Sequence, residues 1–177
     1  MTTNFQTAYD AAPAMGKLGQ LSDASDNDIV SRFSAAKIPF GRFVSFDTTQ
    51  GKVKLPAAAT DIINTTSYAV CDGIALEDPS KESTAENTLG LAGANVPAHD
   101  IYDAIPVLKR GRCFVYSEQA VNPSLPVFVR HTANSTSQLA GNFRVDEDSA
   151  KATDLGEKAH WVSVTTGAGL AEIDIRL

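Results

Sequence analysis

Apolar and charged residues alternate without a break over the last seven residues, Ala171-Glu172-Ile173-Asp174-Ile175-Arg176-Leu177. A period of two sends alternate side chains to opposite faces of a strand, one buried and one wet. This pattern is typical of an antiparallel sheet with a single covered face. The segment 161–164 precedes it across Gly167-Ala168-Gly169, which predicts a final hairpin with Trp161 in the core.

Short strand patterns separated by turn residues fill the chain from residue 42 onward. β-branched and aromatic residues on both sides of 47–51 predict a hairpin of strands 42–46 and 52–55. Further strands are predicted at 67–76 with a bulge at Gly73, at 105–108 and 112–117 around a hairpin turn at 109–111, at 126–131 and at 141–145. The best helical window, 28–37, covers only two turns. Successive strands without helices between them predict an all-β fold, an antiparallel β-barrel or sandwich.

The first thirty residues contrast with this pattern, because their few large apolar side chains follow neither a helical nor a strand period. A polar extended segment that buries little surface alone can still order on a partner. Fully extended, 36 residues reach on the order of 100 Å. We therefore predict an extended N-terminal arm at 1–36 that docks on a neighbour, followed by one β domain at 37–177. The alternatives are an arm packed across its own domain and a disordered tail. The predicted anchors of the arm are Phe5, Tyr9, Pro13, Met15, Leu18, Leu21 and Ile29.

A second polar stretch, at 77–100, interrupts the strands. It is too long for an ordinary β connection, and loops of this length are usually functional or disordered. We expect it to be an insertion on the outside of the domain or against a neighbour.

Composition limits the partners of the protein. The 177 residues suffice for one domain with a core, and the net charge is −6 with a pI near 5.0. An acidic surface repels phosphate backbones and anionic lipids, so we expect neither nucleic acid nor membrane as a partner. No secretory leader or membrane-spanning run is recognisable, and we expect a soluble protein made in a cytoplasm. Cys71 and Cys113 are predicted as buried thiols rather than a disulfide.

The residues that carry chemistry form no catalytic pattern. His99, His131 and His160 are scattered and are expected at the surface or at strand edges. The acidic runs 23–28 and 146–148 lack the spacing of a calcium loop, and we interpret them as solvated loops. No phosphate loop, nucleophile elbow or zinc motif occurs. We therefore expect no enzyme activity, no catalytic residue, no cofactor and no metal.

Several segments resemble one known family. They are Ala8-Tyr9, Pro13-Ala14-Met15-Gly16 and Gln20-Leu21-Ser22-Asp23 in the arm; the join Ile38-Pro39-Phe40-Gly41-Arg42-Phe43-Val44; Val53-Lys54-Leu55-Pro56; Gly73-Ile74-Ala75; the stretch 107–115; Pro126-Val127-Phe128-Val129-Arg130; and Gly141-Asn142-Phe143. Over most of its length the chain resembles the structural cement, or capsid decoration, proteins of tailed bacteriophages. It departs from the family pattern at Pro123-Ser124-Leu125-Pro126 and in the insertion 77–100.

The resemblance implies a non-enzymatic virion protein, made in the cytoplasm of the bacterial host and placed on the outer capsid surface. It implies binding to the major capsid protein and stabilisation of contacts between capsid subunits. It favours a small closed homo-oligomer, a trimer first and a dimer next. The competing interpretations are another phage tail or baseplate module, a carbohydrate-binding β module and, less favoured, a β-barrel hydrolase.

Overall fold

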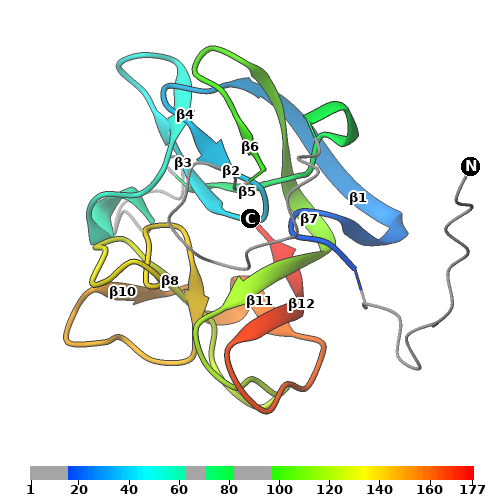
Figure 1. The fold of residues 1–177 in the computed structure, drawn as a ribbon, viewed down its shortest axis with the longest axis vertical. Helices are drawn as coiled ribbons and strands as arrows, with labels where there is room; N and C mark the ends of the chain where they lie inside the picture. The colour runs from blue at the N-terminus through cyan, green and yellow to red at the C-terminus, as the bar shows by residue number, and fades with distance from the viewer. Residues whose placement is uncertain (1–15, 63–70, 82–96) are drawn as a thin grey trace, which may run out of the picture.

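The protein is described by a computed structural model that covers residues 16–62, 71–81 and 97–177 (Figure 1). The strands are β1 (Leu21–Phe33), β2 (Ile38–Pro39), β3 (Phe43–Asp47), β4 (Lys52–Lys54), β5 (Cys71–Ala75), β6 (Ala98–His99), β7 (Ala104–Ser117), β8 (Phe128–Arg130), β9 (Phe143–Arg144), β10 (Ala152–Asp154), β11 (Ala159–Trp161) and β12 (Gly169–Arg176). Three single 3-10 turns accompany them, η1 (Ala59–Asp61), η3 (Pro79–Lys81) and η4 (Gly156–Lys158). The all-β prediction is confirmed. Within the described ranges no helix has the length and apolar character of a membrane span.

The strand β7 is the centre of the sheet. It pairs with β1, β5 and β12 in antiparallel fashion and with β9 in parallel fashion. From β7 the hydrogen-bonded path runs through β5 and β3 to β4 on one side, and through β9 and β8 to β10 on the other. Among the described strands this path stays open between β10 and β4, so the sheet is sandwich-like rather than a closed barrel.

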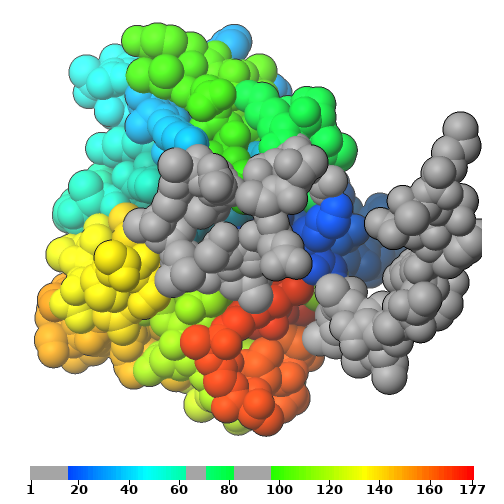
Figure 2. Space-filling view, viewed as in Figure 1, coloured from blue at the N-terminus to red at the C-terminus, as the bar shows by residue number. Residues whose placement is uncertain are grey.

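Two hydrophobic cores lie along this sheet. The larger one contains Phe43, Phe143 and Trp161 together with the buried residues of β12. The smaller one contains Ile38, Val44, Val53, Ala75, Ile105 and Val107. In Figure 2 the C-terminal segments gather in the lower half of the view, and the segments around β3, β4 and β6 lie in the upper half.

The alternating pattern at the C-terminus is confirmed as a strand with one buried face. β12 pairs with β7 and with β11, and Ala171, Ile173 and Ile175 are fully buried. Trp161 on β11 is 1% exposed and donates its indole N–H to the carbonyl of Pro126 at 3.1 Å. The hairpin of β3 and β4 and the strands β8 and β9 also follow the sequence patterns.

The predicted hairpin around 109–111 is wrong, because β7 runs straight through these residues as one strand of 14 residues. Asp28 lies opposite Arg110 but Ile29 lies opposite Leu108, so Lys109 is an extra residue in β7, a β-bulge. Gly111 has φ of 130°, a conformation that favours glycine. A bulge next to a glycine therefore gives the same sequence signal as a turn.

The helical window at 28–37 is also wrong, since its first six residues form the end of β1. Residues 21–33 pair with β7 inside the main sheet. Backbone hydrogen bonds across the sheet outweigh the weak helix propensity of a two-turn segment. The middle of the insertion, 82–96, lies outside the described residues. On either side of it, η3 and β6 belong to the domain, and β6 pairs with β2.

Candidate functional site

The N-terminal segment enters the domain through a tightly fixed root, residues 16–20. Gly19 donates its N–H to the carbonyl of Phe114 at 2.8 Å, and Phe114 donates to the carbonyl of Gln20 at 2.9 Å. A Cβ at Gly16 would lie 2.3 Å from the Phe114 ring, and one at Gly19 would lie 2.7 Å from the backbone nitrogen of Glu77. Only glycine fits at these two close approaches. The root is therefore held by β7 and by the segment after β5.

The predicted anchors of the arm fall into three groups. Phe5, Tyr9, Pro13 and Met15 lie outside the described residues. Leu18 is 8% exposed, and Leu21 packs against the larger core, so the domain itself uses both side chains. Ile29 is 43% exposed on β1. For 16–36 the structure thus shows the alternative of an arm packed on its own domain, and Ile29 keeps a side chain that a partner could contact.

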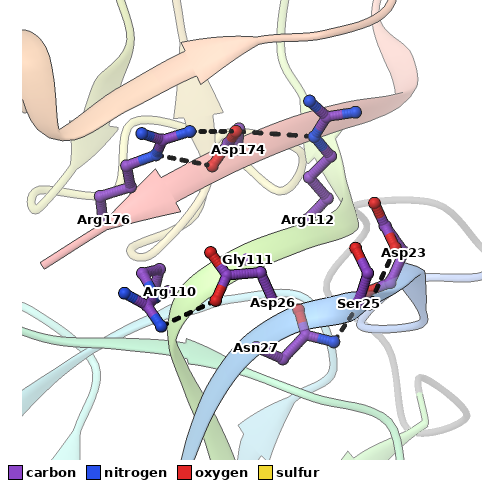
Figure 3. Close-up of a pocket in the computed structure, with 9 residues that line it drawn as sticks. All are labelled: Asp23, Ser25, Asp26, Asn27, Arg110, Gly111, Arg112, Asp174 and Arg176. Carbon is purple, nitrogen blue, oxygen red and sulfur yellow. Dashed lines mark hydrogen bonds and ion pairs between the residues drawn. The ribbon is translucent and has the colours of Figure 1, made fainter.

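A polar hollow of about 180 Å³ lies beside this root, between β1, β7 and β12 (Figure 3). It exists because β1 bulges: Asp23 lies opposite Arg112 and Asp28 opposite Arg110, so the four residues between them face Gly111 alone. A Cβ at Gly111 would lie 2.0 Å from Oδ1 of Asn27, so a larger residue would push the bulge away. The lining residues are Asp23, Ser25, Asp26, Asn27, Arg110, Gly111, Arg112, Asp174 and Arg176.

The charges of the hollow balance, since it contains three arginines and three aspartates. Arg110 pairs with Asp26 at 2.8 Å, and Asp174 is shared by Arg112 at 3.5 Å and Arg176 at 3.3 Å. In Figure 3 Arg176, Asp174 and Arg112 form one row, and Arg110 with Asp26 lies across from it. The exposed Arg110–Asp26 pair contributes little to stability and is screened by salt, whereas Asp174 is largely buried between its two arginines. The donors and acceptors of the hollow suit reversible contacts with polar groups of a partner.

A second ionic cluster, the buried network, lies where β7, β8 and β9 meet. Its centre is Arg130, whose side chain is fully buried and bonds both oxygens of Glu118 at 2.8 Å. Arg130 also bonds Asp148 at 2.6 Å. Arg144 bonds Glu118 at 3.1 Å and Asp148 at 3.0 Å. The network therefore fixes the turn after β9 against the end of β7.

Amide groups complete the buried network. Asn142 donates to Glu118 at 3.1 Å and to the carbonyl of Ser137 at 3.0 Å, and its own carbonyl accepts from Arg42. Burial lowers the pKa of Arg42 to about 10, although Glu118 opposes this shift. For Arg130, burial lowers the pKa, but the hydrogen bonds to Glu118 and Asp148 outweigh it and raise the pKa above its ordinary value. The satisfied donors indicate a structural role.

The buried network adds ion pairs to one acidic run that the sequence predicted as a solvated loop. Asp146 and Glu147 are exposed, as expected for a solvated acidic loop, but Asp146 and Asp148 also pair with arginines of the network. Hydrogen bonds from Gln119 and Arg144 lower the pKa of Asp146 despite its partial burial, and the hydrogen bond from Arg130 lowers that of Asp148. The signal that could have revealed the network is an arginine at an inward position of two strands, Arg130 and Arg144.

Two of the three histidines and both cysteines are buried. His99 and His131 are buried rather than at the surface, and Nε2 of His99 bonds the carbonyl of Leu76 at 2.8 Å. Both thiols are free and buried, as predicted. Burial raises the pKa of Cys71 to about 12 and raises that of Cys113 as well, so neither forms a thiolate nucleophile near neutral pH. In the part of the chain that the structure describes, no group of three potential ligands could hold a metal ion.

Comparison with known proteins identifies the relatives of this fold. The family model described as "Structural cement protein (E217 gp24/Pam3 gp6)" matches residues 5–176. No curated protein matches the chain. Among solved structures, a chain from "The capsid of Myoviridae Phage XM1" is similar with a TM-score of 0.67 and 18% sequence identity, over 98% of both chains. At this identity the structural likeness shows a shared fold.

Proposed function

Because this chain belongs to the structural cement protein family, we propose that it binds the outer surface of a tailed-phage head and stabilises contacts between major capsid protein subunits. The family makes it a phage capsid cement protein, a structural component of the virion. The observation that carries the proposal is the match over residues 5–176, which includes both the N-terminal segment and the β domain.

We propose that residues 1–15 are the clamp that reaches a capsid subunit, with Phe5, Tyr9, Pro13 and Met15 as anchors. The fixed root supports this role, because tension on the clamp passes through Gly19 into Phe114 of the central strand. Fifteen extended residues span roughly 50 Å. This length suffices to cross from the domain onto a neighbouring subunit.

In this proposal the high overall affinity for the capsid comes from avidity. Several modest contacts of linked modules bind far more tightly than any one of them. We propose that the chain forms a small closed homo-oligomer on the capsid, with a trimer and a dimer as its two candidate forms. We also propose that it acts without catalysis and without contact to nucleic acid or membrane, which the net charge of −6 and the protonated buried thiols support.

Co-sedimentation with expanded, undecorated phage heads tests the proposal. We expect saturable binding at a fixed ratio to the capsid subunit, with free protein as the control. Failure to bind would overturn the cement function for such heads and favour a tail or baseplate module.

A deletion of residues 2–15 tests the clamp. A deletion of 2–36 is unsuitable, because it would remove β1 from the sheet. We expect the shorter deletion to keep the thermal unfolding transition of the full chain and to lose most of its binding to heads. Unchanged affinity would show that residues 1–15 are not the clamp. The matched control is the quadruple alanine variant of Phe5, Tyr9, Pro13 and Met15, which should lose binding at full length.

A further inference from the structure

The strand β1 has one edge that carries no partner among the described strands. Its other edge pairs with β7 at Leu21, at Asp23 and from Asp28 to Phe33. Beyond its end, Ala35 donates its N–H to the carbonyl of Val53 at 2.8 Å, so β4 closes the edge from residue 35 onward. On the other side the bulge at 23–28 interrupts the regular strand. The open edge is therefore the five-residue segment Ile29–Phe33.

The direction of the backbone groups on this segment follows from the neighbouring bonds. Leu76 donates its N–H to the carbonyl of Pro106 at 2.9 Å, so the backbone carbonyl of Pro106 faces β5. The backbone groups of the two adjacent residues, Ile105 and Val107, therefore face β1. In β1 their partners Arg32 and Val30 therefore use their N–H and C=O groups toward β7. Since the direction alternates along a strand, Ile29, Ser31 and Phe33 turn their backbone groups to the open edge.

The side chains of the same three residues lie on the exposed face. Ile29 is 43% exposed and Phe33 is 58% exposed, with Ser31 exposed between them. Tyr102, 64% exposed, donates its backbone N–H to Ser34 at 3.0 Å and so extends the apolar surface beyond Phe33. Of the five exposed large hydrophobic residues in the described ranges, only Val164 is not on β1 or in the loop at its end, which also contains Ile101. Unpaired edges with apolar side chains are sites where another strand adds.

We propose that the open edge of β1 pairs with the same edge of a second copy of this chain, antiparallel and around a two-fold axis at Ser31. In this register Ser31 lies opposite itself, and Ile29 lies opposite Phe33 of the second copy. All three pairs are of the hydrogen-bonded kind, so they form six backbone hydrogen bonds. Two cross-strand Ile–Phe pairs cover the exposed apolar side chains.

The sequence of the open edge favours a second copy of the chain as the partner strand, and it favours one pairing register. A shift by two residues places Phe33 against Asn27 or Ile29 against Ala35, and larger shifts run into the bulge or into β4. Only the register centred on Ser31 pairs both apolar side chains with each other, and it places no two like charges opposite each other between Asp28 and Ser34. This self-complementarity favours a second copy over an unrelated strand. The inference rests on the self-association proposed above and selects the dimer of its two candidate forms.

Cross-linking tests the two-fold axis in solution. The Cα atoms of a hydrogen-bonded antiparallel pair lie about 5.5 Å apart, within the range for a disulfide. We expect Ser31→Cys to form a disulfide-linked dimer under mild oxidation, read on a non-reducing gel. The matched control is Thr166→Cys, also exposed. Because pairing raises the effective concentration of the two thiols, the rate should exceed that of the control on the order of tenfold. Equal rates would overturn the proposal.

Charge substitution tests the register. The double variant Ile29→Lys with Phe33→Lys places like charges opposite each other, and we expect it to sediment as a monomer of 18.7 kDa in analytical ultracentrifugation. The matched variant Ile29→Lys with Phe33→Glu places opposite charges across the axis, and we expect it to remain a dimer. A monomeric or trimeric wild-type chain, or a dimer in both variants, would overturn the inference.

These measurements use no phage heads, so their failure is distinct from failure of the cement function. If the wild-type chain is a monomer and the double-lysine variant loses only its binding to heads, the edge receives a strand of the capsid instead. That result would overturn the second copy as the occupant and leave the capsid function in place.

Discussion

Two clusters of arginines and carboxylates in this molecule use the same chemistry at opposite degrees of burial. In the buried network Arg130 is 0% and Glu118 2% exposed. In the polar hollow Arg110 is 54% and Arg176 65% exposed. The first cluster connects β7 to β8 and β9, whereas the second borders the bulge of β1.

The comparison shows that burial, rather than the number of ion pairs, decides what such a cluster contributes. Charges removed from water have lost their hydration, so each buried partner depends on the others. Exposed charges keep their hydration and interact weakly through a high dielectric. The buried network thus sets the position of the turns at 131–150, while the exposed arginines of the hollow remain free to exchange water for the polar groups of a partner.

The largest effect is expected for Arg130→Met, which leaves Glu118 buried with fewer partners. We expect this variant to lower the free energy of unfolding by about 3–5 kcal/mol, measured by urea denaturation. Its matched control in the hollow, Arg110→Met, should change this free energy by less than about 1 kcal/mol. Similar losses in the two variants would contradict the role of burial.

Lowering the pH should weaken the buried network, and we expect this effect on stability to be intermediate in size. The folded-state pKa values of Asp146 and Asp148 are lowered, so their contribution to stability is present above the unfolded pKa, about 4, and is lost as the pH falls toward the lower folded pKa. We expect the midpoint of thermal unfolding to fall from pH 5 to pH 3. The variant Asp148→Asn should show a smaller fall over this range. An equal fall would assign the acid sensitivity to other carboxylates.

The smallest effect is expected for Asp26→Asn, which removes the pair with Arg110 on the surface. We expect a change in the free energy of unfolding below about 1 kcal/mol at low salt and a still smaller change at 1 M salt, where screening is strong. Urea denaturation at the two ionic strengths measures both values. A large change that persists in high salt would mean that the bulge of β1 depends on this pair.

Strands whose two faces differ in environment could be predicted from the sequence. β12 shows this best, since its alternation placed Ile173 and Ile175 on the buried face. β1 could not be predicted, and β7 was predicted only as two strands joined by a turn. Residues 22–28 carry no apolar alternation, because they cover the polar hollow rather than a core. In β7 the extra Lys109 and Gly111 gave the local signal of a turn, although strands on both sides hold the chain extended.

The candidate sites were predicted less well than the fold. Of the predicted anchors within the described residues, Ile29 is at the surface, whereas Leu18 and Leu21 serve the domain. The open edge was not predicted, because an unpaired backbone group has no signature in the side chains. The buried network was missed because Glu118 and Arg130 are twelve residues apart, and nothing local shows that their side chains meet.

By itself, the sequence determined the strand-rich class, the buried face of β12, the buried thiols and the resemblance to the cement family, because each depends on local composition or on a period of two. Only the tertiary structure decided that β1 joins the sheet, that three arginines and three carboxylates meet at one surface hollow, and that the described strands leave Ile29–Phe33 open. These features depend on which strands become neighbours. That choice is made by contacts between residues far apart in the chain, where side-chain periodicity carries no information.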